Sequence, residues 1–176
     1  MIRSFKNTAP QIPDSCYIFP NATVIGNVIF GKNIIAYPGC VIRAEYGKIS
    51  IGSYTNLQEN TSIHVEVGYD VTIGEGVTIG HNCIIHGCTI HDNVLIGMGA
   101  IIQEGADIGE NCFIGAGAVI KRNMVIPSGS VVYGIPARII RPIAQAEFDE
   151  IRVTIAEYQS YLQEFKRQDA EKGTNY

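Results

Sequence analysis

The sequence predicts an all-β solenoid followed by one C-terminal α-helix, and three observations support this class. An aliphatic residue followed by glycine returns at intervals of six residues, or multiples of six, between about residues 24 and 134. A small or β-branched residue usually stands four places after the aliphatic one. After this repeat, apolar residues recur at steps of three and four, which is the period of an amphipathic helix.

The six-residue period fits short strands that turn a corner at every repeat, and it does not fit a helix. Three units make one triangular coil, and stacked coils pair their strands in parallel about 4.8 Å apart. We expect the glycine to sit at the corner, where it tolerates unusual backbone angles. The aliphatic residues predicted to point inward are Phe30, Ala36, Ile42, Ile51, Leu57, Ile63, Ile73, Ile79, Ile85, Ile90, Ile96, Ile102, Ile108, Ile114, Ile120, Ile126 and Val132. The small residues predicted to point inward are Val77, Cys83, Thr89, Ala100, Ala106, Cys112, Ala118 and Ser130.

The repeat is interrupted three times near its middle. The spacing after Ile42 is three residues too long, the spacing after Ile63 is four too long, and the spacing after Ile85 is one too short. A solenoid pushes insertions out as loops, often on the face that binds a ligand or partner. We therefore expect the functional site near these irregularities, which lie close to the histidines.

The chain divides into three predicted segments. Residues 1–142 form the solenoid domain, residues 143–168 form an amphipathic helix packed on its outside, and residues 169–176 form a polar tail. Pro136 and Pro142 end strand pairing. The apolar positions of the helix are Phe148, Ile151, Ile155, Tyr158, Leu162 and Phe165. A coiled-coil partner for this helix is disfavoured because the pattern spans too few heptads.

Composition excludes several classes of protein. A length of 176 residues suits one domain, and the formal net charge of −4 gives no support for binding nucleic acid or an anionic membrane. No apolar run approaches a membrane span, and residues 1–10 lack the apolar core of a signal peptide, so a cytoplasmic location is expected. The five cysteines argue against a disulfide framework and are interpreted as buried fillers.

The repeat places two histidines in one column. Units three apart stack on one another, so Arg43, His64, His86 and Gln103, each of which follows an inward aliphatic residue, lie along one corner. Stacked neighbours about 4.8 Å apart can share a metal ion, because two nitrogens near 2.1 Å from zinc lie within reach of each other.

His81 occupies the preceding corner, where it stacks on Glu59 beside Gln58. Side chains at adjacent corners of a prism point apart, so His81 cannot easily join His64 and His86 of its own chain. Three copies around a threefold axis would bring His81 of one chain to the pair of another. The predicted site is therefore a three-histidine metal site between subunits of a homotrimer, with a fourth position open for water, as in catalytic zinc sites.

The alternative is that these histidines are solvated turn residues, as a lone histidine at a solenoid corner usually is. Three histidines beside two insertions, with Arg43 in the same column, favour a metal, but spacing alone leaves both interpretations open. His91, next to Asp92, is interpreted as a surface residue.

Five segments together resemble the γ-class carbonic anhydrases. They read TNLQEN at 55–60, IH at 63–64, VTIGH at 77–81, HGC at 86–88 and LIGMGA at 95–100. The resemblance extends from about Pro20 to Arg141 and into the trailing helix. The six-residue repeat alone is shared with many acyltransferases, whereas the spaced histidines with the Asn-x-Gln segment are much more specific.

The resemblance implies a left-handed parallel β-helix, a homotrimer and a metal site at each subunit interface, with His64, His81 and His86 as ligands. The implied enzyme is a lyase in which Zn²⁺ lowers the pKa of its bound water to near 7, so that hydroxide hydrates CO₂ reversibly to bicarbonate. Fe²⁺ or Co²⁺ could replace zinc in an all-imidazole site.

The resemblance also assigns catalytic positions. Gln58 matches the residue that hydrogen-bonds the metal-bound solvent, and Asn56 lies beside it. Arg43 matches an interface arginine that pairs with a carboxylate. Glu45 and Glu59 stand where the family usually has aspartate, so each carboxylate reaches one methylene further. A shift on the order of 1 Å can cost about a hundredfold in rate.

Two other functions remain open from the sequence. A hexapeptide-repeat acyltransferase that uses coenzyme A, with a histidine as general base, fits the repeat but does not need three converging imidazoles. A metal-stabilised trimer with little or no turnover fits the altered carboxylates. Glu66, in the loop at residues 65–72, could carry protons, although a solvated loop acid is the plainer interpretation.

Overall fold

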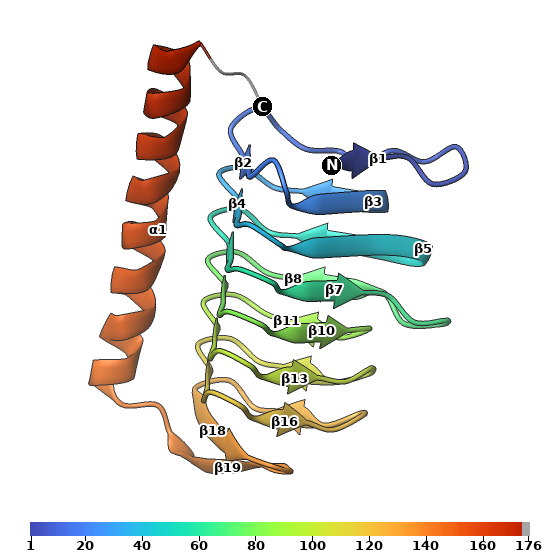
Figure 1. Ribbon diagram of the computed structural model, residues 1–176. Helices are drawn as coiled ribbons and strands as arrows, with labels where there is room; N and C mark the ends of the chain where they lie inside the picture. Colours follow the sequence, from blue (N-terminus) through green and yellow to red (C-terminus); the bar gives the residue numbers. More distant parts are fainter. Residues whose placement is uncertain (174–176) are drawn as a thin grey trace.

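Short parallel strands stack into a three-sided column, as the six-residue repeat predicts (Figure 1). The structure is a computed structural model that describes residues 1–173. In Figure 1 the chain crosses the front of the column from left to right and returns behind it while descending, so the coil is left-handed. The predicted fold class, a left-handed parallel β-solenoid with one C-terminal helix, is confirmed.

The three sides of the column are named here by an element that each contains. The β7 face holds β7 (Ser62–His64), β10 (Ile84–His86), β13 (Ile101–Ile102), β16 (Val119–Ile120) and the first parts of β3 (Thr23–Phe30) and β5 (Val41–Ile51). The β8 face holds β8 (Val71–Ile73), β11 (Thr89–Ile90), β14 (Asp107–Ile108), β17 (Val125–Ile126) and the remainder of β3 and β5. The helix face holds β2 (Tyr17–Ile18), β4 (Ile35–Ala36), β6 (Asn56–Leu57), β9 (Thr78–Ile79), β12 (Leu95–Ile96), β15 (Phe113–Ile114) and β18 (Ser130–Gly134). β1 (Ile2–Arg3) pairs with β3, and β19 (Ala137–Pro142) pairs antiparallel with β18.

The interior is a continuous aliphatic column. Every aliphatic residue predicted to point inward is buried, and the most exposed of them is Phe30 at 4%. Seven of the eight small residues predicted inside are also buried. Thr89 was assigned wrongly, because it faces outward from β11 and is only half-buried. Cys88 takes the inward place, since the coil is one residue short at this corner.

The glycine that follows each inward aliphatic residue has a different role from the one expected. Gly80 does not have a positive φ; a Cβ there would lie 2.7 Å from the backbone nitrogen of Met98 in the next coil. Glycine is required at this position because the stacked backbones approach so closely. The left-handed conformation falls two residues later, at Asn82 with φ of 57° and at Gly99 with φ of 71°.

This distinction gives a prediction for stability. Gly109→Ala would place a Cβ 2.5 Å from the Ser128 nitrogen, whereas Gly117 has φ of +68° and open space around it. We expect Gly109→Ala to lower the free energy of unfolding by about 1–3 kcal/mol through overpacking. Gly117→Asn should change it by less than about 1 kcal/mol, since asparagine tolerates this conformation. Thermal unfolding at matched protein concentration would test both, and equal shifts in Tm would contradict this assignment.

The insertions lie at the corner between the β7 and β8 faces. The first is not a loop, because β5 runs unbroken around the corner as an eleven-residue strand. The second forms a tight turn in which Glu66 and Tyr69 exchange backbone hydrogen bonds of 3.1 and 2.8 Å. At the shortened corner Gly87 has φ of 54°, and a Cβ there would lie 2.9 Å from the Tyr69 Cβ.

The helix α1 spans Gln145–Lys172, whereas residues 143–168 were expected, so residues 169–172 of the predicted tail are helical. Arg167 forms ion pairs with Glu164 and Glu171 one turn away on either side, and these pairs support the last turns. Gly173 closes the helix in the left-handed conformation. The remainder of the predicted tail, 174–176, lies outside the described residues.

The helix α1 lies along the helix face of the column (Figure 1), where aromatic contacts hold it. Phe165 packs on Tyr17 and Phe19 with ring centroids 5.6 and 4.9 Å apart, and Tyr158 meets Tyr37 edge-on. No helix within residues 1–173 combines the length and apolar character needed to cross a membrane.

Candidate metal centre

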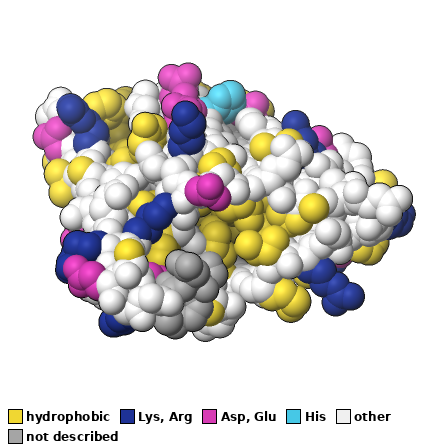
Figure 2. Space-filling view, turned by 90° about the horizontal axis from the view of Figure 1, so that it is seen from above, with side chains coloured by type: hydrophobic (Ala, Val, Ile, Leu, Met, Phe, Trp, Pro, Cys, Tyr) yellow, Lys and Arg dark blue, Asp and Glu magenta, His cyan; other side chains and the backbone are white. Residues whose placement is uncertain are grey.

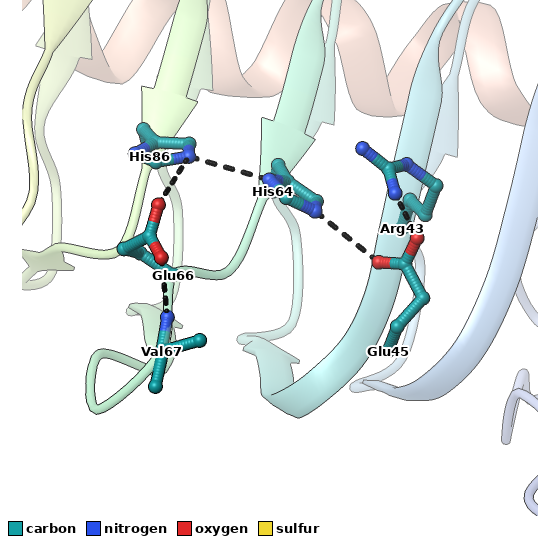
Figure 3. Close-up of polar contacts among 6 residues, drawn as sticks. All are labelled: Arg43, Glu45, His64, Glu66, Val67 and His86. Carbon is teal, nitrogen blue, oxygen red and sulfur yellow. Dashed lines mark hydrogen bonds and ion pairs between the residues drawn. The ribbon is translucent and has the colours of Figure 1, made fainter.

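The register aligns Arg43, His64 and His86 in one column, as the repeat predicts. Arg43 pairs with His64 across β5 and β7, and His64 pairs with His86 across β7 and β10. Gln103 directly follows Ile102, which pairs with Ile85, so it continues the column. We call this edge, between the β7 and β8 faces, the His86 corner (Figure 3).

Two imidazoles face each other at the His86 corner. His64 Nδ1 lies 3.3 Å from His86 Nε2, and the ring centroids are 5.3 Å apart at an interplanar angle of 34°. Two nitrogens bound to one tetrahedral zinc ion at about 2.1 Å each are about 3.4 Å apart. The spacing of the two ring nitrogens therefore fits two ligands of a single ion.

Carboxylates engage the outer nitrogen of each ring. Glu45 Oε2 lies 3.2 Å from His64 Nε2, and Arg43 pairs with the same glutamate (Figure 3). Burial, followed by the charges of Arg43 and His86, lowers the pKa of His64. A neutral imidazole is the form that binds metal, so this environment favours the ligand state.

The other end of the pair repeats this arrangement with residues that the sequence analysis missed. Glu104 Oε2 lies 3.5 Å from His86 Nδ1, and Arg122 pairs with Glu104. The backbone N–H of Glu104 itself, then Arg122 and His86, hold the pKa of the Glu104 carboxyl below its usual range. The available signal was positional, since Glu104 and Arg122 stand at the same corner one and two coils beyond His86.

Glu66 approaches the same ring from the other side. Its Oε2 lies 3.9 Å from His86 Nε2, while its Oε1 accepts the backbone N–H of Val67 at 2.8 Å (Figure 3). The Glu66 side chain is 41% exposed, so this carboxylate lies near His86 Nε2 and is also accessible to solvent.

His81 lies at the corner between the helix face and the β7 face, which we call the His81 corner. Its Nδ1 lies 2.6 Å from Glu59 Oε2, confirming the predicted stacking of these two residues. Since Nδ1 is engaged by the carboxylate, Nε2 is the nitrogen available to a metal.

Asn56 and Gln58 are buried beside the His81 corner. Asn56 Nδ2 donates to Thr78 Oγ1 at 2.8 Å, and Gln58 Nε2 donates to Asn56 Oδ1 at 3.4 Å. These bonds fix the orientation of both amides. Thr78 is a further residue missed by the sequence analysis, although the register places it directly opposite Asn56.

The predicted site residues thus form two groups at different corners. One group holds Arg43, Glu45, His64 and His86, and the other holds Asn56, Gln58, Glu59 and His81. Within residues 1–173 of a single chain, no three His, Cys, Asp or Glu side chains gather closely enough to hold a metal ion. The sequence predicts this separation into two corners, and the joining of the two groups at one metal ion stays a prediction.

The described residues also form two surface hollows. One, of 350 Å³, lies beside Glu45 and includes Lys6, Lys48 and Asp70 among its lining residues. The other, of 720 Å³, lies between the first coil and the end of α1, where hydrophobic side chains gather at the upper end of the molecule (Figure 2). None of the predicted site residues lines the larger hollow.

Part of the chain matches a known family model. Residues 87–122 match the model described as bacterial transferase hexapeptide (six repeats). This segment covers the coils that carry Gln103, Glu104 and Arg122.

Known relatives cover most of the chain. A protein of Methanocaldococcus jannaschii named "Probable carbonic anhydrase" is 43% identical over 84% of this chain and 93% of its own length. Protein YrdA of Escherichia coli is 35% identical over 94% of both chains. Gamma carbonic anhydrase 1, mitochondrial, from Arabidopsis thaliana is 35% identical over 92% of this chain, which spans 61% of that relative's length. Because this plant relative is named as mitochondrial, the cytoplasmic location expected from the sequence stays a prediction.

Solved structures share the fold. A Bacillus cereus protein provisionally assigned as an acetyltransferase has a TM-score of 0.92 at 33% identity, covering 95% of this chain and 97% of its own. A hexapeptide transferase family protein from Anaplasma phagocytophilum has a TM-score of 0.89 at 32% identity, covering 93% and 97%.

Proposed function

The chain belongs to the γ-class carbonic anhydrase family of hexapeptide-repeat proteins, and from this premise we propose that it hydrates CO₂ reversibly to bicarbonate at a three-histidine site between the subunits of a homotrimer. The observation that carries the proposal is the 3.3 Å spacing of the inner ring nitrogens of His64 and His86, whose outer nitrogens face glutamates. His81 has the same kind of partner in Glu59 and would supply the third ligand from a neighbouring subunit. Metal-binding histidines almost always present their second nitrogen to such a group.

The β7 face supports the trimer. It lies between the His81 and His86 corners, and its outward residues include Val41 at 39% exposure and Ile84 at 43%. The corresponding outward positions of the β8 face include the polar Thr72 and Asp107, and a valine, Val125, only at its last strand. The third face is covered by α1 (Figure 1). Burying the β7 face between copies of the chain would remove apolar surface from water and bring the two corners together.

Imidazole donors suit Zn²⁺, and they also accept Fe²⁺ or Co²⁺. When bound, the metal supplies Lewis acidity and brings the pKa of water at the site to near 7.

The remaining site residues would orient the histidine ligands and the substrate, or accept a proton. Glu45 and Glu59 hold the rings of His64 and His81, and Arg43 fixes Glu45. The amide of Gln58, held by Asn56, would hydrogen-bond solvent and CO₂ beside the metal site. Glu66, partly exposed beside His86, would accept the proton released by hydration.

Stopped-flow hydration of CO₂ tests the proposal directly. Protein loaded with zinc, or with cobalt, should hydrate CO₂ faster than buffer, and removal of the metal with a chelator should abolish the difference. No rate above buffer at full metal occupancy would contradict the proposed activity.

Experiments on the same purified protein distinguish this activity from two alternative functions. The transferase descriptions of the two similar solved structures favour an acyltransferase as the second candidate. Tight binding of coenzyme A in calorimetry, without bound metal, would support it. A trimer that dissociates on chelation but hydrates CO₂ no faster than buffer would indicate a metal-stabilised assembly without turnover.

A further inference from the structure

The His64–His86 pair has matching partners at its two ends. At one end Glu45 faces His64 Nε2 and is paired with Arg43; at the other, Glu104 faces His86 Nδ1. Both glutamates are largely shielded, with 14% and 19% of their side chains exposed. Each glutamate therefore makes two contacts, one with an arginine and one with a ring nitrogen of a candidate metal ligand.

The backbone explains why Glu104 reaches His86. The coils approach so closely at this corner that a Cβ on Gly87 would lie 3.1 Å from the Glu104 Cβ. Gly87 therefore allows the turn that carries Glu104 to pack directly against the turn that follows His86. Arg122, from the next coil, pairs with Glu104 from the far side.

We propose that Glu104, anchored by Arg122, is a positioning residue that keeps the proton of His86 on Nδ1 and so presents Nε2 towards His64. A carboxylate accepts hydrogen bonds and cannot donate them, so it selects the nitrogen that carries the proton. Glu45 selects the proton on His64 Nε2 by the same reasoning. Glu66 is the weaker competitor for the His86 proton, because its Oε2 lies 3.9 Å from Nε2 whereas Glu104 lies 3.5 Å from Nδ1. The two inner nitrogens then both present lone pairs across 3.3 Å, an arrangement that favours a cation between them.

The orientation of His86 can be measured without any metal. In ¹⁵N-labelled, metal-free protein at one fixed pH, the Nδ1 resonance of His86 should be that of a protonated nitrogen. Glu104→Gln replaces the carboxylate with an amide that can also donate, so the resonance should move towards that of an unprotonated nitrogen. Asp107→Asn is the matched control, because Asp107 faces His91 Nε2 at 3.0 Å on the β8 face. It should move the His91 resonances and leave those of His86 unchanged.

Metal affinity gives the second readout, and only this part depends on the proposed function. Competition with a chelator should show that Glu104→Gln weakens zinc binding by about 10–100-fold, as expected for loss of an outer partner of a ligand. Asp107→Asn should bind zinc like the parent. If Glu104→Gln does not fold, Arg122→Gln removes the anchor but keeps the carboxylate, and should change both readouts in the same direction.

The outcomes distinguish the two proposals. An unchanged His86 resonance in Glu104→Gln, together with zinc affinity within about twofold of the parent, would overturn the positioning role and leave the metal site standing. A parent that binds no zinc, but whose His86 resonance still moves in Glu104→Gln, would sink the proposed function and support the positioning role.

Discussion

Replacing His81 by alanine is expected to empty the metal site, reducing metal from about one ion per chain to little and CO₂ hydration to the rate of buffer. His81 would be the sole ligand donated across the subunit boundary, and the remaining His64 and His86 hold zinc poorly as a pair. Loss of a direct ligand should weaken binding by more than the roughly 10–100-fold that loss of an outer partner costs. Elemental analysis of purified protein measures the first effect, and stopped-flow kinetics measures the second.

The matched control is His91→Ala. His91 is also a corner histidine with a carboxylate partner, and its side chain is 47% exposed against 44% for His81. It lies beside the β8 face, away from the His81 and His86 corners, so its loss should leave metal content and rate at the parent level. Parent-level metal in His81→Ala, or equal loss in both variants, would refute the assignment of His81.

Placing a charge at the centre of the β7 face is expected to dissociate the proposed trimer. Ile84 points outward from β10 between the two corners, and the residue is 43% exposed in the single chain. In the proposed trimer it is buried, so the ammonium of Ile84→Lys would have to be desolvated without a partner. The variant should have a mass near 19.2 kDa in solution, against three times that for the parent. It should also lose its metal.

Val125→Lys provides the comparison. Val125 points outward from β17 on the β8 face and is 67% exposed, so it is at least as accessible as Ile84 in the single chain. Analytical ultracentrifugation should show a metal-loaded trimer for Val125→Lys. A trimeric Ile84→Lys protein that keeps its metal would place the interface elsewhere.

Most of the solenoid follows from the sequence because one inward aliphatic residue per strand defines both the period and the register. That register was enough to align His64 with His86 and His81 with Glu59. Thr89 was misplaced because a coil can lose a residue at a corner and restore its register by shifting the inward small residue to Cys88. Counting from one aliphatic residue cannot show where the missing position falls.

The path of the first insertion and the role of Glu104 depend on contacts between coils, which the sequence pattern does not show. Sequence patterns do not show whether an insertion loops out or stays hydrogen-bonded, and β5 remains a strand because it pairs with β3, β7 and β8. Glu104 was missed because its importance arises from a neighbouring coil 18 positions away from His86, where an isolated turn glutamate is unremarkable. Both errors concern contacts between coils.

The proposed sharing of each site between two chains is most directly tested by mixing two inactive variants. His81→Ala keeps an intact His64–His86 pair, and a His64→Ala, His86→Ala double variant keeps His81. Neither should bind zinc alone, but trimers reassembled at random from equal amounts should have about one quarter of their sites complete, since each site needs one chain of each kind in the right order. Zinc near one quarter of the parent content, with a matching fraction of the hydration rate, is the predicted result. Reassembled mixed trimers without zinc, beside a parent treated in the same way that binds it, would contradict the shared site.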